Sequence, residues 1–241
     1  TSDREDLERY IDVTRGELFF SKGVILVEGD AEKFLLPTLA KLYDESLDFD
    51  AMGITVCSIA GTNFAPYVQL LGPKGLDIPF VVLTDYDPKN EVTSQEDADP
   101  DGAGVTDSYG ENRVVNQIMQ HILDDDVWKG SNFAQVMELA PKHGVFLNEF
   151  TFEIDVFRTG AEDHFLTAIK ELTTNKKMHA RFASLATDPD SLDPSQFLKD
   201  IDSIGKGRMA QRLASVLIEE DVDVCPEYIE SALDYLRAKL G

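Results

Sequence analysis

Acidic side chains follow three short apolar runs of the sequence, each near the point where the run ends. They are Glu28 after residues 24–27, Asp85 and Asp87 after residues 80–83, and Glu153 after residues 145–147. Side chains at alternate positions of an extended segment point the same way, which places Asp85 and Asp87 on one side. Carboxylates so close together repel unless a cation lies between them. Oxygen ligands without His or Cys select Mg²⁺, Mn²⁺ or Ca²⁺ over zinc, so the pattern predicts a divalent-metal site.

Such a site needs strands whose ends meet at one edge of a sheet. Residues 24–27 form a short β-branched run without polar alternation, which is typical of a strand buried on both faces of a parallel sheet. The runs 54–59, 80–83 and 145–147 indicate further strands. Segments with helical spacing lie between them, near 31–43, 64–71 and 112–123. The alternation predicts an α/β fold with an about four-stranded, mostly parallel sheet and flanking helices. In such sheets ligands bind beyond the carboxyl ends of the strands.

Outside this alternation the sequence predicts helices only. Residues 3–20 indicate a lead-in helix, and helical spacing recurs at 162–172, 176–186, 195–201, 207–219 and 226–240. Asp193-Pro194-Ser195-Gln196 supplies a helix cap and a first-turn proline. We therefore expect a domain over 1–159 and an all-helical domain over 160–241. The acidic stretch from Asp87 to Gly110 is too long for an ordinary connection and is either a functional loop or partly disordered.

The charge of the chain limits the partners that it can bind. The 241 residues include 22 Lys and Arg against 45 Asp and Glu, a net charge of −23. This field repels a polyanion such as DNA, so any nucleic-acid site must be local. The densest basic cluster could contact a DNA backbone or could be a solvated helix face. It consists of Lys170, Lys176, Lys177, His179 and Arg181.

The sequence also indicates the setting of the protein. Its apolar runs are far shorter than the ~20 residues that span a bilayer, and the first residues lack the pattern of a signal peptide. Cys57 and Cys225 are in unrelated contexts without a metal-ligand spacing. We expect a cytoplasmic protein without a membrane segment.

The acids and their neighbours resemble the signature of Toprim domains, which occur in topoisomerases, primases and nucleases. The resemblance rests on Val27-Glu28-Gly29 after one buried strand and Asp85-Tyr86-Asp87 after another. Further segments resemble the OLD (overcoming lysogenization defect) nucleases in particular. They are Glu32, the turn Ala60-Gly61-Thr62-Asn63-Phe64, Thr151-Phe152-Glu153, and Gly205-Lys206-Gly207-Arg208 before a late helix. These matches extend from about Phe19 to Leu217.

The resemblance implies a DNA endonuclease that hydrolyses phosphodiester bonds with two Mg²⁺ or Mn²⁺ ions, Ca²⁺ being a non-productive substitute. It implies that Glu28, Asp85 and Asp87 hold one ion, while Glu32, Glu153 and the Thr151 hydroxyl help to hold a second. Lys206 would neutralise charge on the phosphate, which makes Glu28, Asp85 and Lys206 the expected catalytic residues.

The family also pairs this region with an amino-terminal ATPase. No GxxxxGK[ST] motif and no initiator Met occur here, so we expect the ATPase on another part of the polypeptide. A homodimer of the longer protein is a further expectation.

Several of these residues also have purely structural interpretations. Asp30, just ahead of a helix, is interpreted as its N-cap rather than as a ligand. Glu32 could be a first-turn acid that complements the helix dipole. Asp85-Tyr86-Asp87 could be a solvated turn, and Lys206 a surface lysine.

Other functions would use the same acids. A topoisomerase or primase would share Glu28, Asp85 and Asp87, but its tyrosine nucleophile domain or nucleotide-binding domain is not recognisable in the remainder. A phosphatase of the haloacid dehalogenase type would use Asp85 as nucleophile and Asp87 as acid, yet it expects Gly-Thr where Pro88-Lys89 stands. A non-catalytic Toprim module that docks partners is a third alternative, against which the retention of all the expected acids argues.

Overall fold

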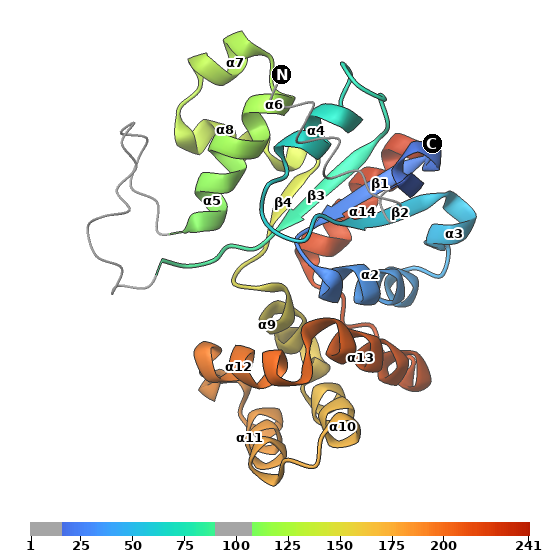
Figure 1. The fold of residues 1–241 in the computed structure, drawn as a ribbon, viewed down its shortest axis with the longest axis vertical. Helices are drawn as coiled ribbons and strands as arrows, with labels where there is room; N and C mark the ends of the chain where they lie inside the picture. Colours follow the sequence, from blue (N-terminus) through green and yellow to red (C-terminus); the bar gives the residue numbers. More distant parts are fainter. Residues whose placement is uncertain (1–15, 90–107) are drawn as a thin grey trace.

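The computed structural model describes residues 16–89 and 108–241 (Figure 1). Of the expected lead-in helix, the described part is the 3-10 helix η1 (Gly16–Phe20), and the rest lies outside the described residues. Most of the acidic stretch after Asp87 also lies outside them, over residues 90–107.

The centre of the fold is a parallel sheet of four strands. They are β1 (Gly23–Val27), β2 (Ile54–Ser58), β3 (Phe80–Thr84) and β4 (Val145–Leu147), in the order β2-β1-β3-β4. This confirms the predicted sheet. The register aligns the strand ends, since Val27 lies opposite Ser58 and Thr84 opposite Leu147. The residues that follow β1, β3 and β4 therefore lie at one edge.

Helices bury both faces of this sheet, which is why its strands show no polar alternation. Val24 and Leu26 of β1 face one hydrophobic core, while Ile25 and Val27 face another. The first face packs against α4 (Ala65–Leu71), the π-helix η3 (Val114–Met119) and α8 (Phe133–Leu139). The second packs against α2 (Asp30–Tyr43) and α14 (Glu227–Leu240). The remaining elements between β1 and β4 are α3 (Phe49–Met52), α5 (Tyr109–Arg113), α6 (Gln120–Ile122), α7 (Asp125–Gly130) and η4 (Pro141–His143).

After β4 the chain is helical, as expected. The elements are α9 (Phe152–Val156), the π-helix η5 (Phe157–Ala161), α10 (Glu162–Leu172), α11 (Lys176–Thr187), η6 (Pro189–Ser191), α12 (Pro194–Ile204) and α13 (Lys206–Glu220). Asp193 caps α12, because its carboxylate accepts a hydrogen bond from the Gln196 amide at 3.0 Å. Phe157, Phe165 and Phe197 pack with ring centroids 5.1–5.8 Å apart, so aromatic rings form the core of this part.

The last helix returns to the sheet. In Figure 1, helix α14 lies beside the sheet and away from α10 and α11, and it contacts β3 and β4. Helix α13 lies along α2. A single hydrophobic core therefore runs from the second face of the sheet into the helical part. The division at residue 160 stays a prediction, since the last strand already ends at Leu147 and the hydrophobic core has no break at residue 160.

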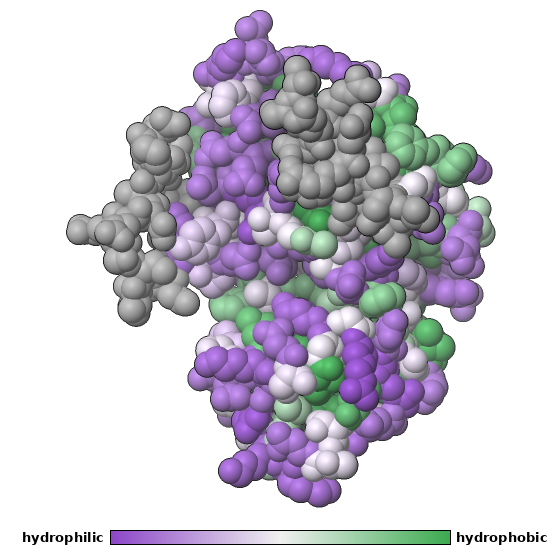
Figure 2. Space-filling model, in the orientation of Figure 1, coloured by the Kyte–Doolittle hydropathy of each residue, from purple (hydrophilic) through white to green (hydrophobic). Residues whose placement is uncertain are grey.

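Hydrophilic side chains cover much of the face shown in Figure 2. Arg181, from the basic cluster, is neutralised within the helical part, because its Nε and Nη2 donate to Asp200 at 2.7 and 2.5 Å. None of the helices in the described part of the chain has the length and apolar character needed to cross a membrane.

Candidate active site

Glu28 and Asp85 meet at the carboxyl edge of the sheet because β1 and β3 are neighbours. Glu28 Oε1 accepts hydrogen bonds from Thr84 Oγ1 at 2.6 Å and from the Asp85 amide at 2.9 Å. Burial raises the pKa of Glu28, although the nearby Arg113 guanidinium and these hydrogen bonds oppose the shift. Thr84, at the end of β3, thus orients Glu28, which follows β1.

Asp85 is held in turn by residues that follow β4. Its Oδ1 accepts from Asn148 Nδ2 at 2.5 Å and from the Phe152 amide at 3.0 Å. Burial and the charges of the surrounding carboxylates, Glu28 foremost, raise its pKa well above the ordinary range. The negative charge of Asp85 is therefore poorly tolerated without a cation nearby.

Asp87 lies at the same edge, but on a turn rather than on the extended segment that alternation predicted. Its φ of 50° is left-handed, and its amide donates to the Phe150 carbonyl at 3.2 Å. Its Oδ2 accepts from Arg113 Nη2 at 2.8 Å, and Arg113 Nη1 donates to Glu28 Oε1 at 2.6 Å. The guanidinium therefore links two of the predicted ligands.

A second acidic pair comes from the first turns of two helices, Glu32 on α2 and Glu153 on α9. Both are buried, with 8% and 6% exposed. Burial, with smaller contributions from Glu153 and Glu28, raises the pKa of Glu32 to about 7. Glu153 Oε2 and the Thr151 hydroxyl are buried without a hydrogen-bond partner among the described residues. Because buried polar atoms normally have partners, these two atoms suit an ion or water.

Lys206 is the first residue of α13, and it follows Gly205, whose φ of 97° few other residues adopt. Its Nζ lies 3.1 Å from Glu153 Oε1. Burial disfavours its charge, but Glu153 and Asp85 outweigh this effect and raise its pKa. The helical part thus supplies a cation beside Glu153.

One structural interpretation of these acids was wrong. Asp30 is not the N-cap of α2: that position belongs to Gly29, which has no side chain to cap with, and Asp30 is the first helical residue. Glu32 does lie in the first turn, but its burial beside Glu153 and Glu28 is not that of a solvated dipole partner.

Sequence reasoning missed Arg113, Asn148 and Thr84. Asn148 follows β4 directly, just as Glu28 follows β1, so its position was a usable signal. Thr84, the last residue of β3, directly precedes the quoted motif Asp85-Tyr86-Asp87. No spacing in the sequence connects Arg113, on α5, to the acids.

The donor set fits a divalent cation. Five carboxylates face two cations, Arg113 and Lys206, which leaves an excess of negative charge. Glu28, Asp85 and Asp87 are each held through one oxygen, while the second has no hydrogen-bond partner in the part of the chain that is described. Within residues 16–89 and 108–241, no three acidic, His or Cys side chains are already in ligating positions around one point.

Fold and site together define a Toprim domain. The description "Overcoming lysogenization defect protein-like, TOPRIM domain" belongs to the family model that matches residues 19–87. The C-terminal region of the Burkholderia pseudomallei OLD protein is 36% identical, with a TM-score of 0.77 over 92% of this chain and 100% of that one. The corresponding region from Xanthomonas campestris pv. campestris is 37% identical, with a TM-score of 0.71 over 93% and 96%. The chain therefore belongs to the OLD family and corresponds to its carboxy-terminal, Toprim-containing region.

A curated relative has a stated activity. The chain is 26% identical over 251 residues to Endonuclease GajA of Bacillus cereus (strain HuB5-5). The match covers 99% of this chain and 34% of that protein, so the chain spans about a third of its relative's length.

Proposed function

We propose that the chain hydrolyses DNA phosphodiester bonds with divalent metal ions, as the nuclease part of a longer OLD-family protein. The observation that carries this proposal is the arrangement of Glu28, Asp85 and Asp87 at one sheet edge, each fixed through one oxygen. Fixed carboxylates with a second oxygen to spare are suited to binding a hard cation. The endonuclease relative favours the same class of reaction.

Two sets of ligands would serve two ions. Glu28, Asp85 and Asp87 would hold one Mg²⁺ or Mn²⁺, and Glu32, Glu153 and Thr151 would hold the other, with Ca²⁺ as a non-productive substitute. Ions bound there would lower the pKa of a coordinated water and neutralise charge on the leaving oxygen, which makes a histidine base unnecessary.

The protein's own groups would prepare this reaction. Thr84 and Asn148 orient Glu28 and Asp85 through hydrogen bonds of 2.6 and 2.5 Å. Lys206 would exchange its contact with Glu153 for the scissile phosphate. A charge already in place costs little reorganisation when negative charge develops on that phosphate.

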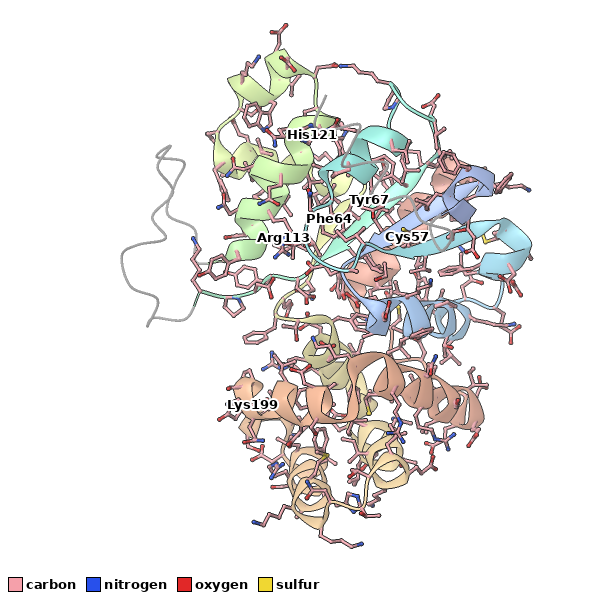
Figure 3. All side chains as sticks on the ribbon, in the orientation of Figure 1. Cys57, Phe64, Tyr67, Arg113, His121 and Lys199 are labelled. Carbon is pink, nitrogen blue, oxygen red and sulfur yellow. The ribbon has the colours of Figure 1, made fainter. Side chains whose placement is uncertain are left out.

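A cleft of about 710 Å³ beside the acids offers a path for one DNA strand. Asp87, Arg113 and Thr151 line one side, and Ser195 and Lys199 of α12 line the other. Figure 3 shows Arg113 and Lys199 on the sheet-containing and helical parts, respectively. Lys199 is exposed and supplies a local positive charge in a chain of net charge −23. In the longer protein, an amino-terminal ATPase and a second copy of the chain are the proposed partners.

Incubation with supercoiled plasmid tests the proposal. Nicking should require Mg²⁺ or Mn²⁺, stop with chelator, and be lost in Asp85→Asn. Asparagine keeps an oxygen to accept the bonds from Asn148 and Phe152, so the fold should stay intact while Mn²⁺ affinity falls by at least about tenfold. Asp125→Asn, which alters an exposed aspartate on α7 that pairs with Lys129, is the matched control.

Other outcomes would point to the alternatives. Release of phosphate from a phosphomonoester without plasmid cleavage would indicate a phosphatase. Relaxed plasmid whose strands have been resealed, so that the circles are covalently closed, would indicate a topoisomerase. Plasmid left intact by a chain that still binds DNA would indicate a docking module.

A further inference from the structure

Arg113 lies at the centre of the site although it comes from neither the Toprim motif nor the helical part. It is the last residue of α5, and its side chain is only 7% exposed. An arginine is seldom buried unless its charge and its donors have partners. Its partners therefore indicate its role.

The guanidinium connects the ends of two strands. Nη1 donates to Glu28 Oε1 and to Thr84 Oγ1, both at 2.6 Å, and approaches the Asp85 carbonyl oxygen at 3.3 Å. Nη2 donates to Asp87 Oδ2 at 2.8 Å. One planar group thus sets the distance between Glu28, after β1, and Asp87, after β3.

The start of α5 is held against the loop that carries the acids. The amides of Tyr109 and Gly110 donate to the carbonyls of Asp87 and Tyr86 at 3.0 and 2.9 Å. A Cβ at residue 110 would lie 2.0 Å from the Asp85 carbonyl oxygen, so only glycine permits this approach. After Arg113 the chain continues into η3, which is buried on the sheet. Arg113 is therefore fixed from both ends of its helix.

We infer that Arg113 is a positioning residue: it presets Glu28 and Asp87 for the first metal ion, an inference that rests on the proposed function. The guanidinium occupies one oxygen of each carboxylate and leaves the other oxygen for the ion. Groups that hold metal-ligating carboxylates in place typically contribute about 10–100-fold to metal affinity. A guanidinium is suited to this role because it stays charged and its rigid fork bridges two acceptors, which a lysine cannot reproduce.

A role limited to charge leads to different expectations. If Arg113 only neutralised buried acids, a lysine would replace it without loss. If the positive charge of Arg113 only repelled the metal ion or occupied its place, a neutral residue at position 113 would let Mn²⁺ bind more tightly. Positioning instead predicts that both substitutions weaken binding.

Calorimetric titration with Mn²⁺ alone separates these roles. Arg113→Lys and Arg113→Gln should each bind Mn²⁺ about 10–100-fold more weakly than the unaltered chain. Arg181→Gln is the matched control, because it breaks the two-point ion pair with Asp200 in the helical part and should leave Mn²⁺ affinity unchanged. The melting temperature of each variant is measured alongside, and Arg113→Lys, which keeps the charge of the buried Glu28 compensated, decides the test if Arg113→Gln does not fold.

Equal Mn²⁺ affinity in Arg113→Lys and the unaltered chain, or tighter binding by Arg113→Gln, would overturn the inference while leaving the proposed function standing. An unaltered chain that binds no Mn²⁺ would instead defeat the proposed function itself, and the inference with it.

Discussion

At the scale of single residues, the acids at the sheet edge differ in how much charge they can carry without an ion. Asp85 is surrounded by carboxylates and burial raises its pKa well above the ordinary range, whereas Glu28 and Asp87 have Arg113 as a partner. For Glu32, burial outweighs the nearby positive charge of Lys206 and raises the pKa to about 7, which places its titration near neutral pH. A metal ion bound as proposed would therefore compete with protons for the same oxygens.

The titration of Glu32 predicts how the stability of the metal-free chain depends on pH. Its folded pKa of about 7 lies above the value of 4.5 for an unperturbed Glu, because burial disfavours the charged form. The stability that the protonated Glu32 carboxyl gives the folded chain is fully present below pH 4.5 and is lost as pH rises through about 7. In chelator, Glu32→Gln should gain on the order of 1–3 kcal/mol relative to the unaltered chain between pH 5 and pH 8.

Melting curves of both proteins across this pH range give the measurement. Parallel pH dependences of the two would show that Glu32 does not titrate in the folded state as described.

Lys206 gives a prediction about rate. A positive charge that stabilises the transition state more than the ground state affects turnover more than binding. Lys206→Ala should therefore lose ~100-fold or more in single-turnover cleavage, roughly the loss of one preorganised donor, with Mn²⁺ affinity nearly unchanged. Lys129→Ala, which alters an exposed lysine on α7, is the control. A normal cleavage rate in Lys206→Ala would reduce this residue to the partner of Glu153.

At the level of helices and strands, the sequence predicted those features that depend on residues close together in the chain. The four strands follow from their apolar runs, and the position of Glu28 and Asp85 follows from the rule that parallel strands end at one edge. Asp193 was recognised as a cap because capping is decided within four residues. Arg113 could not be found in this way, because its contacts with Glu28 and Thr84 span 85 and 29 residues of sequence.

The fit of α5 against the acidic loop makes Gly110 a sensitive position. A Cβ there would overlap the Asp85 carbonyl oxygen at 2.0 Å, so Gly110→Ala must displace either α5 or the loop. Overpacking of this kind typically costs about 1–3 kcal/mol of stability. We expect a lower melting temperature together with weaker Mn²⁺ binding, since Arg113 moves with its helix.

Gly130→Ala is the matched control, because nothing lies within 4 Å of a Cβ at that position on α7. If Gly110→Ala and Gly130→Ala matched each other in both measurements, the fit of α5 would not control the site.

At the scale of the whole molecule, the helical part and the sheet depend on each other. The hydrophobic core includes Val81 of β3, Phe157 of η5 and Leu236 of α14. Tyr228 of α14 lies close to Asn148, which holds Asp85, and to Asp85 itself, so the last helix reaches the site. The sequence indicated five late helices but not that the last one returns to the sheet, because helical periodicity identifies a buried face without identifying what buries it.

This shared core predicts one cooperative unfolding transition. Trp128, the single tryptophan, reports from α7 beside the sheet, while far-UV circular dichroism reports mainly from the helices. Their denaturation midpoints should coincide. Leu236→Ala, which truncates a fully buried side chain of α14, should lower the free energy of unfolding by roughly 2–5 kcal/mol. Both midpoints should then shift together. Two separate transitions would instead support independent domains on either side of residue 160.

Locating bound ions is the decisive measurement for the proposed nuclease, because its chemistry at this sheet edge would require cations among these acids. Crystals of the chain grown with Mn²⁺ should show anomalous scattering at two points roughly 3.5–4 Å apart, the spacing of two-metal sites. We predict one ion bound by Glu28, Asp85 and Asp87, and the other by Glu32, Glu153 and Thr151. Anomalous density elsewhere on the molecule, with none at the carboxyl ends of β1 and β3, would contradict the account.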